Sequence, residues 1–318
     1  MAGPPGSDPH APAGPDRALR VSLAVWVVLA CLLLLLAPPP PPPPVTTAED
    51  EAIFQRTVDQ TVEKTRRWQD ERGDQTIAWN DAKGHVAIVI DDVGRELHLF
   101  EQLLALRYPL SFSVLPGAVY APGVQLRLRA DRRRPREILL HLPCEPEDAA
   151  KMTADAALGE LFLRVGDPPE RLQAALEAAL RRVPAAVGVS NHMGSRLTAE
   201  RAAMDALMPN LRARGLFFLD SETTPASQGQ EAAGAAGVPV LARDIFLDVD
   251  PTPGAVLAQL ELAAQRARDR PVVIIAHPSQ AVVETLREAL PRLHRDGIGV
   301  YPLREILARR GETSAQQH

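Results

Sequence analysis

The stretch HVAIVIDDVG, residues 85–94, joins an apolar run to a pair of acids. All five residues from Val86 to Ile90 are apolar, which is typical of a strand covered on both faces in a parallel sheet. Asp91 and Asp92 follow directly, and the chain then breaks at a glycine. Two like charges side by side repel each other, and partial burial strengthens the repulsion. The rest of the sequence must therefore supply a cation for the pair, unless the pair faces water.

Short apolar runs alternate with amphipathic helical patterns after this strand. The strand candidates are residues 86–90, 110–114, 137–141, 186–190, 216–220, 238–242, 272–277 and 298–301. Apolar residues at i, i+3 and i+4 predict helices over residues 167–183, 198–215, 252–269 and 279–297. This alternation predicts an α/β fold with a mainly parallel sheet, closed or nearly closed into a β/α barrel. An open doubly wound sheet is the alternative, but no glycine-rich phosphate loop follows a strand, so no nucleotide is expected.

The composition is that of a globular chain with an excess of acid. The 318 residues are 46% apolar and 24% charged, with a net charge of −5 and a pI of about 5.9. An acidic chain with three Trp and three Tyr does not fit a nucleic-acid-binding surface, so no nucleic acid is expected as a partner. The two cysteines, Cys31 and Cys144, exclude a disulfide framework or a CxxC zinc site.

The segment Val21–Ala37 carries no charge over seventeen residues, which is the lower limit for a membrane-spanning helix. Arg17 and Arg20 before it, and acidic residues 49–51 after it, predict a cytoplasmic N-terminus. A cleaved signal peptide is the alternative, but the apolar run ends in prolines rather than in a small-residue cleavage site. We therefore expect a single-pass anchor in the cytoplasmic (inner) membrane, with the folded domain on the extracytoplasmic or periplasmic side.

This topology divides the chain into five segments. A disordered cytoplasmic tail covers residues 1–20, and the transmembrane anchor covers residues 21–37. A proline-rich spacer with a helical stalk covers residues 38–83. The folded domain covers residues 84–310, and a short tail covers residues 311–318.

Acidic and imidazole side chains gather where the predicted strands end. They are Asp91, Asp92, His141, His192, Asp220, Asp244 and His277. In parallel β/α folds the carboxyl ends of the strands open onto one face, and active sites are built there. Taken singly, each residue has an ordinary explanation, such as a helix cap, a core histidine or a structural ion pair. Together they predict one polar site on that face.

The residue types in this set indicate metal chemistry. One carboxylate with two or three imidazoles is a common ligand set for zinc, or another borderline divalent ion, with one position left open for water. Such a cation would relieve the repulsion between Asp91 and Asp92. One aspartate would bind the metal while the other acts as a base, and a histidine would protonate the leaving group.

Seven motifs along the chain resemble the divergent polysaccharide deacetylase family. They are IDDVG, FSVLPG, EILLHLPCEP, VSNHMGSRLT, LFFLDSETT, RDIFLD and IIAHPS, and they lie within residues 84–310. That family is a branch of the metal-dependent carbohydrate esterases, which remove acetyl groups from cell-wall and chitin-like glycans. The resemblance implies a distorted β/α barrel of about seven strands. It also implies an acetylated polysaccharide or oligosaccharide as the substrate.

The resemblance assigns roles to four of the strand-end residues. It makes Asp91 the general base and His277 the general acid. Asp92 and His192 become metal ligands, and Zn²⁺ is the expected metal.

One parent ligand has no counterpart here, because Arg196 stands where the parent deacetylases have a second histidine. We expect His141 to serve as the third ligand, since it lies at a strand end. Asp220, Arg243 and Asp244 are expected to orient ligands or to bind sugar hydroxyls.

Our leading hypothesis is a membrane-anchored, metal-dependent deacetylase that hydrolyses C–N or ester bonds of an acetylated envelope polysaccharide or amino sugar. The alternative is a catalytically degenerate barrel that binds an envelope glycan or a protein. The missing second histidine and the low aromatic content, 4%, support this alternative. A third hypothesis keeps the metal but changes the hydrolysed bond to a phosphoester or another amide.

Overall fold

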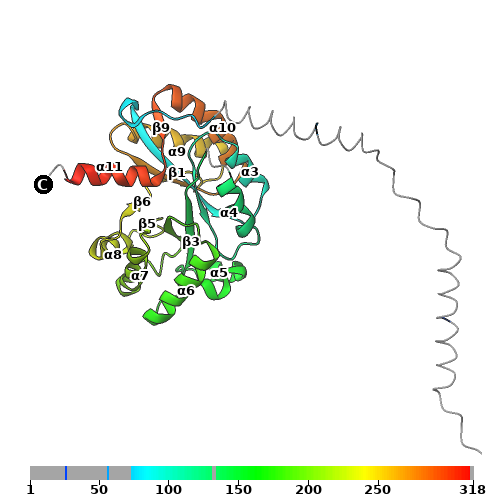
Figure 1. Ribbon diagram of the computed structural model, residues 1–318, viewed down its shortest axis with the longest axis vertical. Helices are drawn as coiled ribbons and strands as arrows, with labels where there is room; N and C mark the ends of the chain where they lie inside the picture. The colour runs from blue at the N-terminus through cyan, green and yellow to red at the C-terminus, as the bar shows by residue number, and fades with distance from the viewer. Residues whose placement is uncertain (1–25, 27–55, 57–72, 131–133, 316–318) are drawn as a thin grey trace, which may run out of the picture. The chain divides into compact units, whose positions relative to one another are not determined.

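The computed structural model describes residues 26, 56, 73–130 and 134–315 (Figure 1). The predicted cytoplasmic tail, the predicted transmembrane anchor apart from residue 26, and most of the predicted stalk lie outside these described residues. Within the described ranges, no helix combines the length and the apolar character needed to cross a bilayer. The chain divides into two units, and the described residues from Gly73 onward all belong to the unit 66–318.

Nine strands form one parallel sheet in the described part of the chain. They are β1 (Gly84–Val93), β2 (Ser111–Val114), β3 (Ile138–Cys144), β4 (Gly188–Met193), β5 (Phe217–Asp220), β6 (Val240–Ala242), β7 (Ile245–Phe246), β8 (Val272–Ala276) and β9 (Ile298–Val300). The strand order is β6-β5-β4-β3-β2-β1-β8-β7, and β9 pairs with β1. All eight predicted strands are confirmed. The additional strand β7 has two residues, too few to show a pattern in the sequence.

The sheet is curled but open. Strands β6 and β7 stand at the two ends of the strand order, so the described strands form a half-barrel rather than a closed barrel. The expectation of a β/α barrel is therefore confirmed for the parallel, curled architecture, and it is wrong for full closure. The break lies between two short strands that are consecutive in the chain.

Helices surround the sheet in Figure 1. They are α3 (His98–Leu104), α4 (Ala121–Ala130), α5 (Ala149–Ala154), α6 (Pro169–Arg182), α7 (Arg201–Ala213), α8 (Gly229–Ala236), α9 (Pro253–Arg266), α10 (Gln280–Arg295) and α11 (Leu303–Ala315), with the 3₁₀ helices η1 (Trp79–Asp81) and η2 (Ala156–Leu161). The four helices predicted from periodicity correspond to α6, α7, α9 and α10. Local signals set the ends of two helices: Ser279 caps α10 by accepting from the Val282 N–H, and Gly237 ends α8 in the left-handed conformation.

Alternation along β1 divides its side chains between two cores. Val86, Ile88 and Ile90 pack in the outer core together with residues of the surrounding helices. Ala87 and Val89 point the other way, into a smaller inner core with residues of β3, β5, β6 and β8. Both faces of this strand are therefore covered, as its unbroken apolar run predicted. Because side chains alternate along a strand, Asp91 follows Val89 on the inner side.

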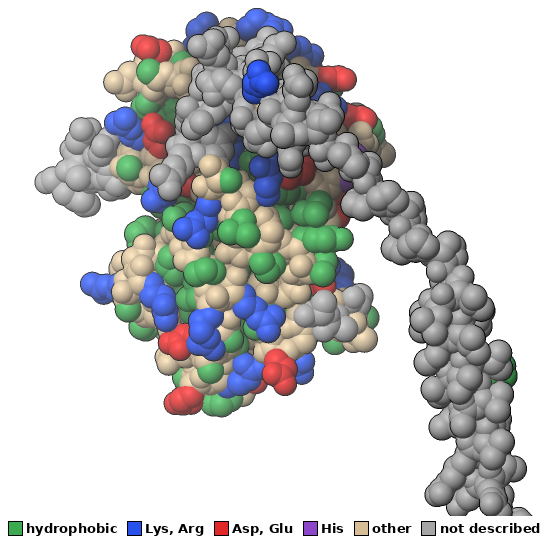
Figure 2. Space-filling view, turned by 45° about the vertical axis from the view of Figure 1, so that its right-hand side comes forward, with side chains coloured by type: hydrophobic (Ala, Val, Ile, Leu, Met, Phe, Trp, Pro, Cys, Tyr) green, Lys and Arg blue, Asp and Glu red, His purple; other side chains and the backbone are tan. Residues whose placement is uncertain are grey.

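The surface carries both signs of charge. On the face shown in Figure 2, acidic side chains lie among the basic ones.

A buried acid, Glu137, closes the inner core at the amino ends of the strands. It directly precedes β3, and its carboxylate accepts a hydrogen bond from Ser111 Oγ at 3.1 Å. It also accepts from the backbone N–H groups of Leu303, at 2.7 Å, and Arg304, at 3.2 Å. These two N–H groups begin α11 and have no acceptor within that helix, so Glu137 caps it. The contact ties α11 to the sheet at the end opposite to the strand-end acids.

We predict that Glu137→Gln lowers the free energy of unfolding by about 2 kcal/mol or more, because the amide places N–H donors against the N–H groups of α11. Glu288→Gln, at an exposed position of α10, is the matched control and should leave stability unchanged. Urea denaturation followed by circular dichroism measures both variants. Equal midpoints for the two variants would contradict this role of Glu137.

Candidate active site

Three side chains converge at the carboxyl ends of neighbouring strands. Asp92 lies on β1, His141 on β3 and His192 on β4, and one ligand atom of each lies within 4.8 Å of the others. Asp92 Oδ1 is 3.2 Å from His141 Nε2 and 2.9 Å from His192 Nδ1. The expectation that these three residues meet in space is therefore met.

Strand register brings the two imidazoles together. His141 pairs with Ser190 across β3 and β4, and His192 lies two residues further along β4, on the same face as Ser190. The two rings stand edge to face with their centroids 5.0 Å apart. Both rings are buried, with His141 2% and His192 6% exposed. The register of β3 and β4 thus fixes both rings before any ligand binds.

An unusual backbone conformation delivers the second carboxylate. Asp92 has a φ of 56°, in the left-handed region, and the β1–β2 register shifts between Ile90 and Val93. Regular alternation would send Asp91 and Asp92 to opposite faces of the sheet. Instead, both carboxylates lie near His141 Nε2, with Asp91 Oδ2 at 3.7 Å and Asp92 Oδ1 at 3.2 Å. The strained residue therefore places two adjacent acids in one site.

The donor set fits a divalent metal. Asp92 Oδ1 is buried and, among the described residues, has no hydrogen-bond partner, although two ring nitrogens lie close to it. Ligand atoms around a tetrahedral zinc, at bonds of about 2.0–2.1 Å, lie about 3.3 Å apart, which is close to the spacing seen here. Two imidazole nitrogens and one carboxylate oxygen also match the ligand preference of zinc and similar ions.

The two adjacent acids have opposite pKa shifts. Burial raises the pKa of Asp91, and the charges of His141 and His277 only partly oppose it. Burial also acts to raise the pKa of Asp92, but the adjoining His141 and His192 rings outweigh it and hold that pKa well below its usual range. The lowered pKa keeps Asp92 ionised, which suits it for binding a cation, and the raised pKa of Asp91 suits it for exchanging a proton. The free Oδ1 of Asp91 is buried and has no hydrogen-bond partner among the described residues.

Asp155 lies on the side of the His192 ring that faces away from Asp92, and Arg95 binds Asp155. His192 Nε2 donates to Asp155 Oδ2 at 2.9 Å, and Arg95 donates to both Asp155 oxygens, at 2.9 and 2.5 Å. Burial lowers the pKa of His192, but Asp155 and Asp92 outweigh it and raise the pKa to about 9. The hydrogen bond to His192, with the Arg95 charge, lowers the pKa of Asp155 to about 2. Because Asp155 accepts from Nε2, Nδ1 of His192 is the nitrogen left to face Asp92.

His277 lies beside Asp91 because β8 pairs with β1, with Ala276 opposite Ile90. Its backbone N–H donates to Asp248 Oδ2 at 2.9 Å, and its Nδ1 lies 3.2 Å from the same oxygen. Partial burial lowers the pKa of His277, but Asp248 and the charge of Asp91 outweigh it and raise the pKa to about 9. The ring is therefore a proton donor at neutral pH, and 41% of the side chain is exposed.

Phe246 and Arg243 support the His277 ring. Phe246 stacks on it with a centroid distance of 5.7 Å, and the Arg243 guanidinium lies 4.2 Å from the centre of the Phe246 ring. Arg243 also donates to the backbone oxygens of Ser221, at 2.7 Å, and Glu222, at 2.8 Å. These contacts hold the loop after β5 and the Phe246 ring, and the role of Arg243 in orienting a ligand stays a prediction.

Two predicted substrate-binding acids have structural partners instead. Asp220 is fully buried, and its carboxylate accepts from Ser227 Oγ at 2.7 Å and from the Glu222 N–H at 2.9 Å. Asp244 accepts from the Val273 N–H at 2.7 Å and pairs with Arg270 at 2.5 Å. Val273 and Arg270 mark the start of β8, whereas His277 marks its end. The chain itself occupies these carboxylate oxygens, and the binding of sugar hydroxyls by Asp220 and Asp244 stays a prediction.

Three residues of the site were not predicted from the sequence: Arg95, Asp155 and Asp248. Asp248 carried a usable signal, since it closes the RDIFLD motif two residues after β7. Asp155 lies between α5 and η2, where nothing in the local pattern distinguishes it from a solvated acid.

Arg196, at the position of the missing parent histidine, lies outside the ligand cluster. Its guanidinium pairs with Glu145 at 2.6 Å, and about half of the side chain is exposed.

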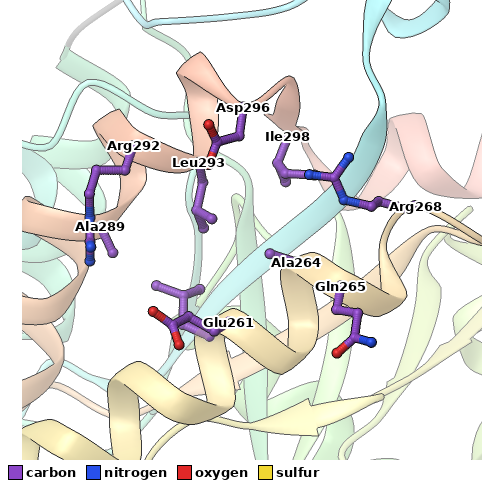
Figure 3. Close-up of a pocket in the computed structure, with 10 residues that line it drawn as sticks. Glu261, Ala264, Gln265, Arg268, Ala289, Arg292, Leu293, Asp296 and Ile298 are labelled. Carbon is purple, nitrogen blue, oxygen red and sulfur yellow. The ribbon is translucent and has the colours of Figure 1, made fainter.

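A separate surface cavity of about 310 Å³ lies between α9 and α10 and includes Glu261 and Arg292 in its lining (Figure 3). None of the strand-end acids or histidines lines this cavity.

Two curated relatives match the chain. An uncharacterized protein of Escherichia coli (strain K12), YibQ, is 32% identical over 212 residues, which cover 66% of this chain and 64% of that protein. An uncharacterized protein of Haemophilus influenzae (strain ATCC 51907 / DSM 11121 / KW20 / Rd) is 33% identical over 212 residues, which cover 66% of this chain and 72% of that protein. The chain thus matches less than two thirds of the length of the E. coli relative.

One solved structure and one family profile also match the chain. The crystal structure of uncharacterized protein ATU2773 from Agrobacterium tumefaciens C58 superimposes with a TM-score of 0.62 at 24% identity, covering 72% of this chain and 92% of that one, and it shows the same fold. The profile of the divergent polysaccharide deacetylases matches residues 88–307, which include Asp91, Asp92 and both imidazoles beside them. The chain therefore belongs to the divergent polysaccharide deacetylase family.

Proposed function

We propose that the protein is a metal-dependent hydrolase that removes acetyl groups from an envelope polysaccharide or amino sugar. The observation that carries this proposal is the convergence of Asp92, His141 and His192 beside a second acid and a protonated histidine. Membership of the divergent polysaccharide deacetylase family supports a carbohydrate substrate. The charge-free N-terminal segment supports a single-pass anchor in the inner membrane, with the domain on the extracytoplasmic side.

The ligand residues would be Asp92 Oδ1, His141 Nε2 and His192 Nδ1, which face one another. A divalent metal, most simply Zn²⁺, supplies Lewis acidity for the acetyl carbonyl and lowers the pKa of a water. Asp92 contributes the negative charge of the ligand set, and Asp155 holds the His192 ring in place.

Asp91 and His277 would move the protons of the reaction. Asp91 has a raised pKa and a free buried oxygen, so it accepts the proton of the attacking water. His277 is protonated at neutral pH and partly exposed, so it donates a proton to the leaving nitrogen or oxygen. The base would then lie on β1, and the acid would directly follow its paired strand β8.

One prediction from this proposal concerns the metal. Asp92→Asn removes the anionic ligand, so zinc retained after dialysis should fall at least tenfold. Acetate release from acetylglucosamine oligomers should fall with it. Asp205 is an exposed acid on α7 that pairs with Arg201. Asp205→Asn is the matched control and should retain both the zinc and the acetate release.

Mass spectrometry of the purified full chain measures the zinc, and an enzymatic acetate assay measures the activity. Zinc binding without acetate release in the unmodified chain would favour a phosphoester or another amide as the substrate. Absence of both would favour the glycan- or protein-binding alternative. Full zinc retention by Asp92→Asn would contradict the proposed ligand set.

Another prediction from this proposal concerns pH. The pKa of His277 lies above its ordinary value of 6.5, so the ring keeps its proton until the pH rises through about 9, and activity should fall above that pH. Asp248→Asn removes the charge that stabilises the protonated ring. The alkaline limb of the pH–kcat profile should therefore move at least one unit towards neutral pH.

Asp250→Asn, an exposed acid two residues further along, is the control for this measurement and should leave the limb in place. An unchanged alkaline limb in Asp248→Asn would show that His277 is not the proton donor whose titration limits the rate.

A further inference from the structure

Four side chains at one edge of the candidate site contact one another in a closed network. Asp92 Oδ1 and His192 Nδ1 lie 2.9 Å apart. On the other side of the imidazole, His192 Nε2 lies 2.9 Å from Asp155 Oδ2. Arg95 closes the network, because its guanidinium donates to both oxygens of Asp155 and its Nε lies 3.5 Å from Asp92 Oδ2. We call these four residues the Arg95 network.

The turn after β1 fixes the backbone from which Arg95 extends. Gly94 has a φ of 110°, in the left-handed region that favours glycine. The backbone oxygens on either side of this turn are both bound: Val93 accepts from the Leu115 N–H and Gly94 accepts from the Tyr120 N–H, each at 3.0 Å. The segment between β2 and α4 therefore holds the turn, and Arg95 follows it directly.

Arg95 divides the two oxygens of Asp92 between two directions. Oδ2 pairs with the Arg95 guanidinium. Oδ1 lies 3.2 Å from His141 Nε2 and 2.9 Å from His192 Nδ1, and it has no hydrogen-bond partner among the described residues. Because a carboxylate is planar, a contact that holds one oxygen also sets the direction of the other. Arg95 thus keeps Oδ1 turned towards the two imidazole nitrogens.

The shape of a guanidinium matters for these contacts. Nη1 and Nη2 of Arg95 donate to the two Asp155 oxygens at 2.9 and 2.5 Å, which leaves Nε to face Asp92. A lysine ammonium carries the same charge, but it is a compact donor on a flexible stem and does not reproduce this fork. Arg95 therefore holds Asp92 directly and holds His192 through Asp155.

The charge of Arg95 and its geometry have opposite effects on a metal. A positive group next to the ligand atoms repels a divalent cation, so the charge by itself weakens metal binding. The contacts of the guanidinium orient Asp92 and the acid behind His192, and such supporting contacts strengthen metal binding. Removal of the arginine therefore tells which of the two effects is larger.

We infer that Arg95 is a positioning residue, which orients Asp92 directly and His192 through Asp155 so that the two facing ligand atoms are prepared to bind one divalent metal. The inference rests on the metal site of the proposed function, and it does not depend on which bond is hydrolysed. It adds a cation outside the ligand set on which the metal affinity depends.

The test measures the zinc affinity of the full chain by chelator competition, with no substrate present. Arg95→Gln removes both the charge and the fork. Loss of the charge alone would tighten zinc binding, whereas loss of the orienting contacts should weaken it about tenfold or more, which is the result we expect. Arg95→Lys keeps the charge without the fork, so it should also weaken zinc binding about tenfold or more.

Arg127→Gln is the matched control. Arg127 on α4 makes a similar two-pronged pair with Glu101, with both distances at 2.9 Å, and neither residue belongs to the site. Its zinc affinity should equal that of the unmodified chain. Circular dichroism checks the fold of every variant, and 41% of the Arg95 side chain is exposed, so its substitution should leave the fold intact.

A double variant tests the route through Asp155. Arg95→Gln and Asp155→Asn break the same network, so their effects on zinc affinity should overlap. The loss in the double variant should therefore be clearly smaller than the product of the two single losses. Fully multiplicative losses would overturn the role of Arg95 in holding His192.

The outcomes separate the inference from the proposed function. Weaker zinc binding in both Arg95 variants, but not in Arg127→Gln, supports the inference even when the unmodified chain releases no acetate, a result that would refute the proposed function alone. Unchanged or tighter zinc binding in Arg95→Gln would overturn the inference, even with acetate release intact. So would full zinc affinity in Arg95→Lys, because the charge would then be sufficient.

Discussion

The repulsion between two adjacent carboxylates, Asp91 buried and Asp92 partly exposed, is the constraint on which the site depends. Asp91 and Asp92 end the central strand β1, and the left-handed conformation at Asp92 sends both to the concave side of the sheet. Two like charges are costly there unless their surroundings differ. The imidazoles of His141 and His192 lower the pKa of Asp92, whereas burial raises the pKa of Asp91. Because their pKa values shift in opposite directions, Asp92 is suited to bind a cation and Asp91 to exchange a proton.

Each imidazole of the site is held through the nitrogen that faces away from the reaction. Asp155 holds His192, Asp248 holds His277, and a serine hydroxyl holds His141. Rings fixed in this way keep their inner nitrogens aimed at the site without help from a ligand. Segments outside the sheet supply the acids, with Asp155 between α5 and η2 and Asp248 after β7.

One candidate ligand, His141, lies on β3, whereas the resemblance to the parent deacetylases implies a second histidine at the position of Arg196. Arg196 stands where the parents have a second histidine, and its side chain turns to Glu145 at the surface. His141 on the neighbouring strand β3 faces the same point as His192. The loss of one imidazole from the loop after β4 is therefore matched by one from β3, and the number of candidate donors is kept. The missing histidine alone is thus weak support for a degenerate site.

Local patterns in the sequence were enough to predict every strand except β7, the four helices α6, α7, α9 and α10, and the meeting of Asp91, Asp92, His141, His192 and His277. The residues meet because parallel strands bring their carboxyl ends to one face. Tertiary structure decided everything that depends on contacts between distant segments. Asp220 and Asp244 also end or follow strands, yet the chain's own N–H groups, hydroxyl and guanidinium groups occupy their oxygens. Asp155 has no local signal, since its partner His192 lies 37 residues away. Hydrophobic periodicity reports which face of an element is buried, whereas the partner of a polar atom depends on how the elements pack.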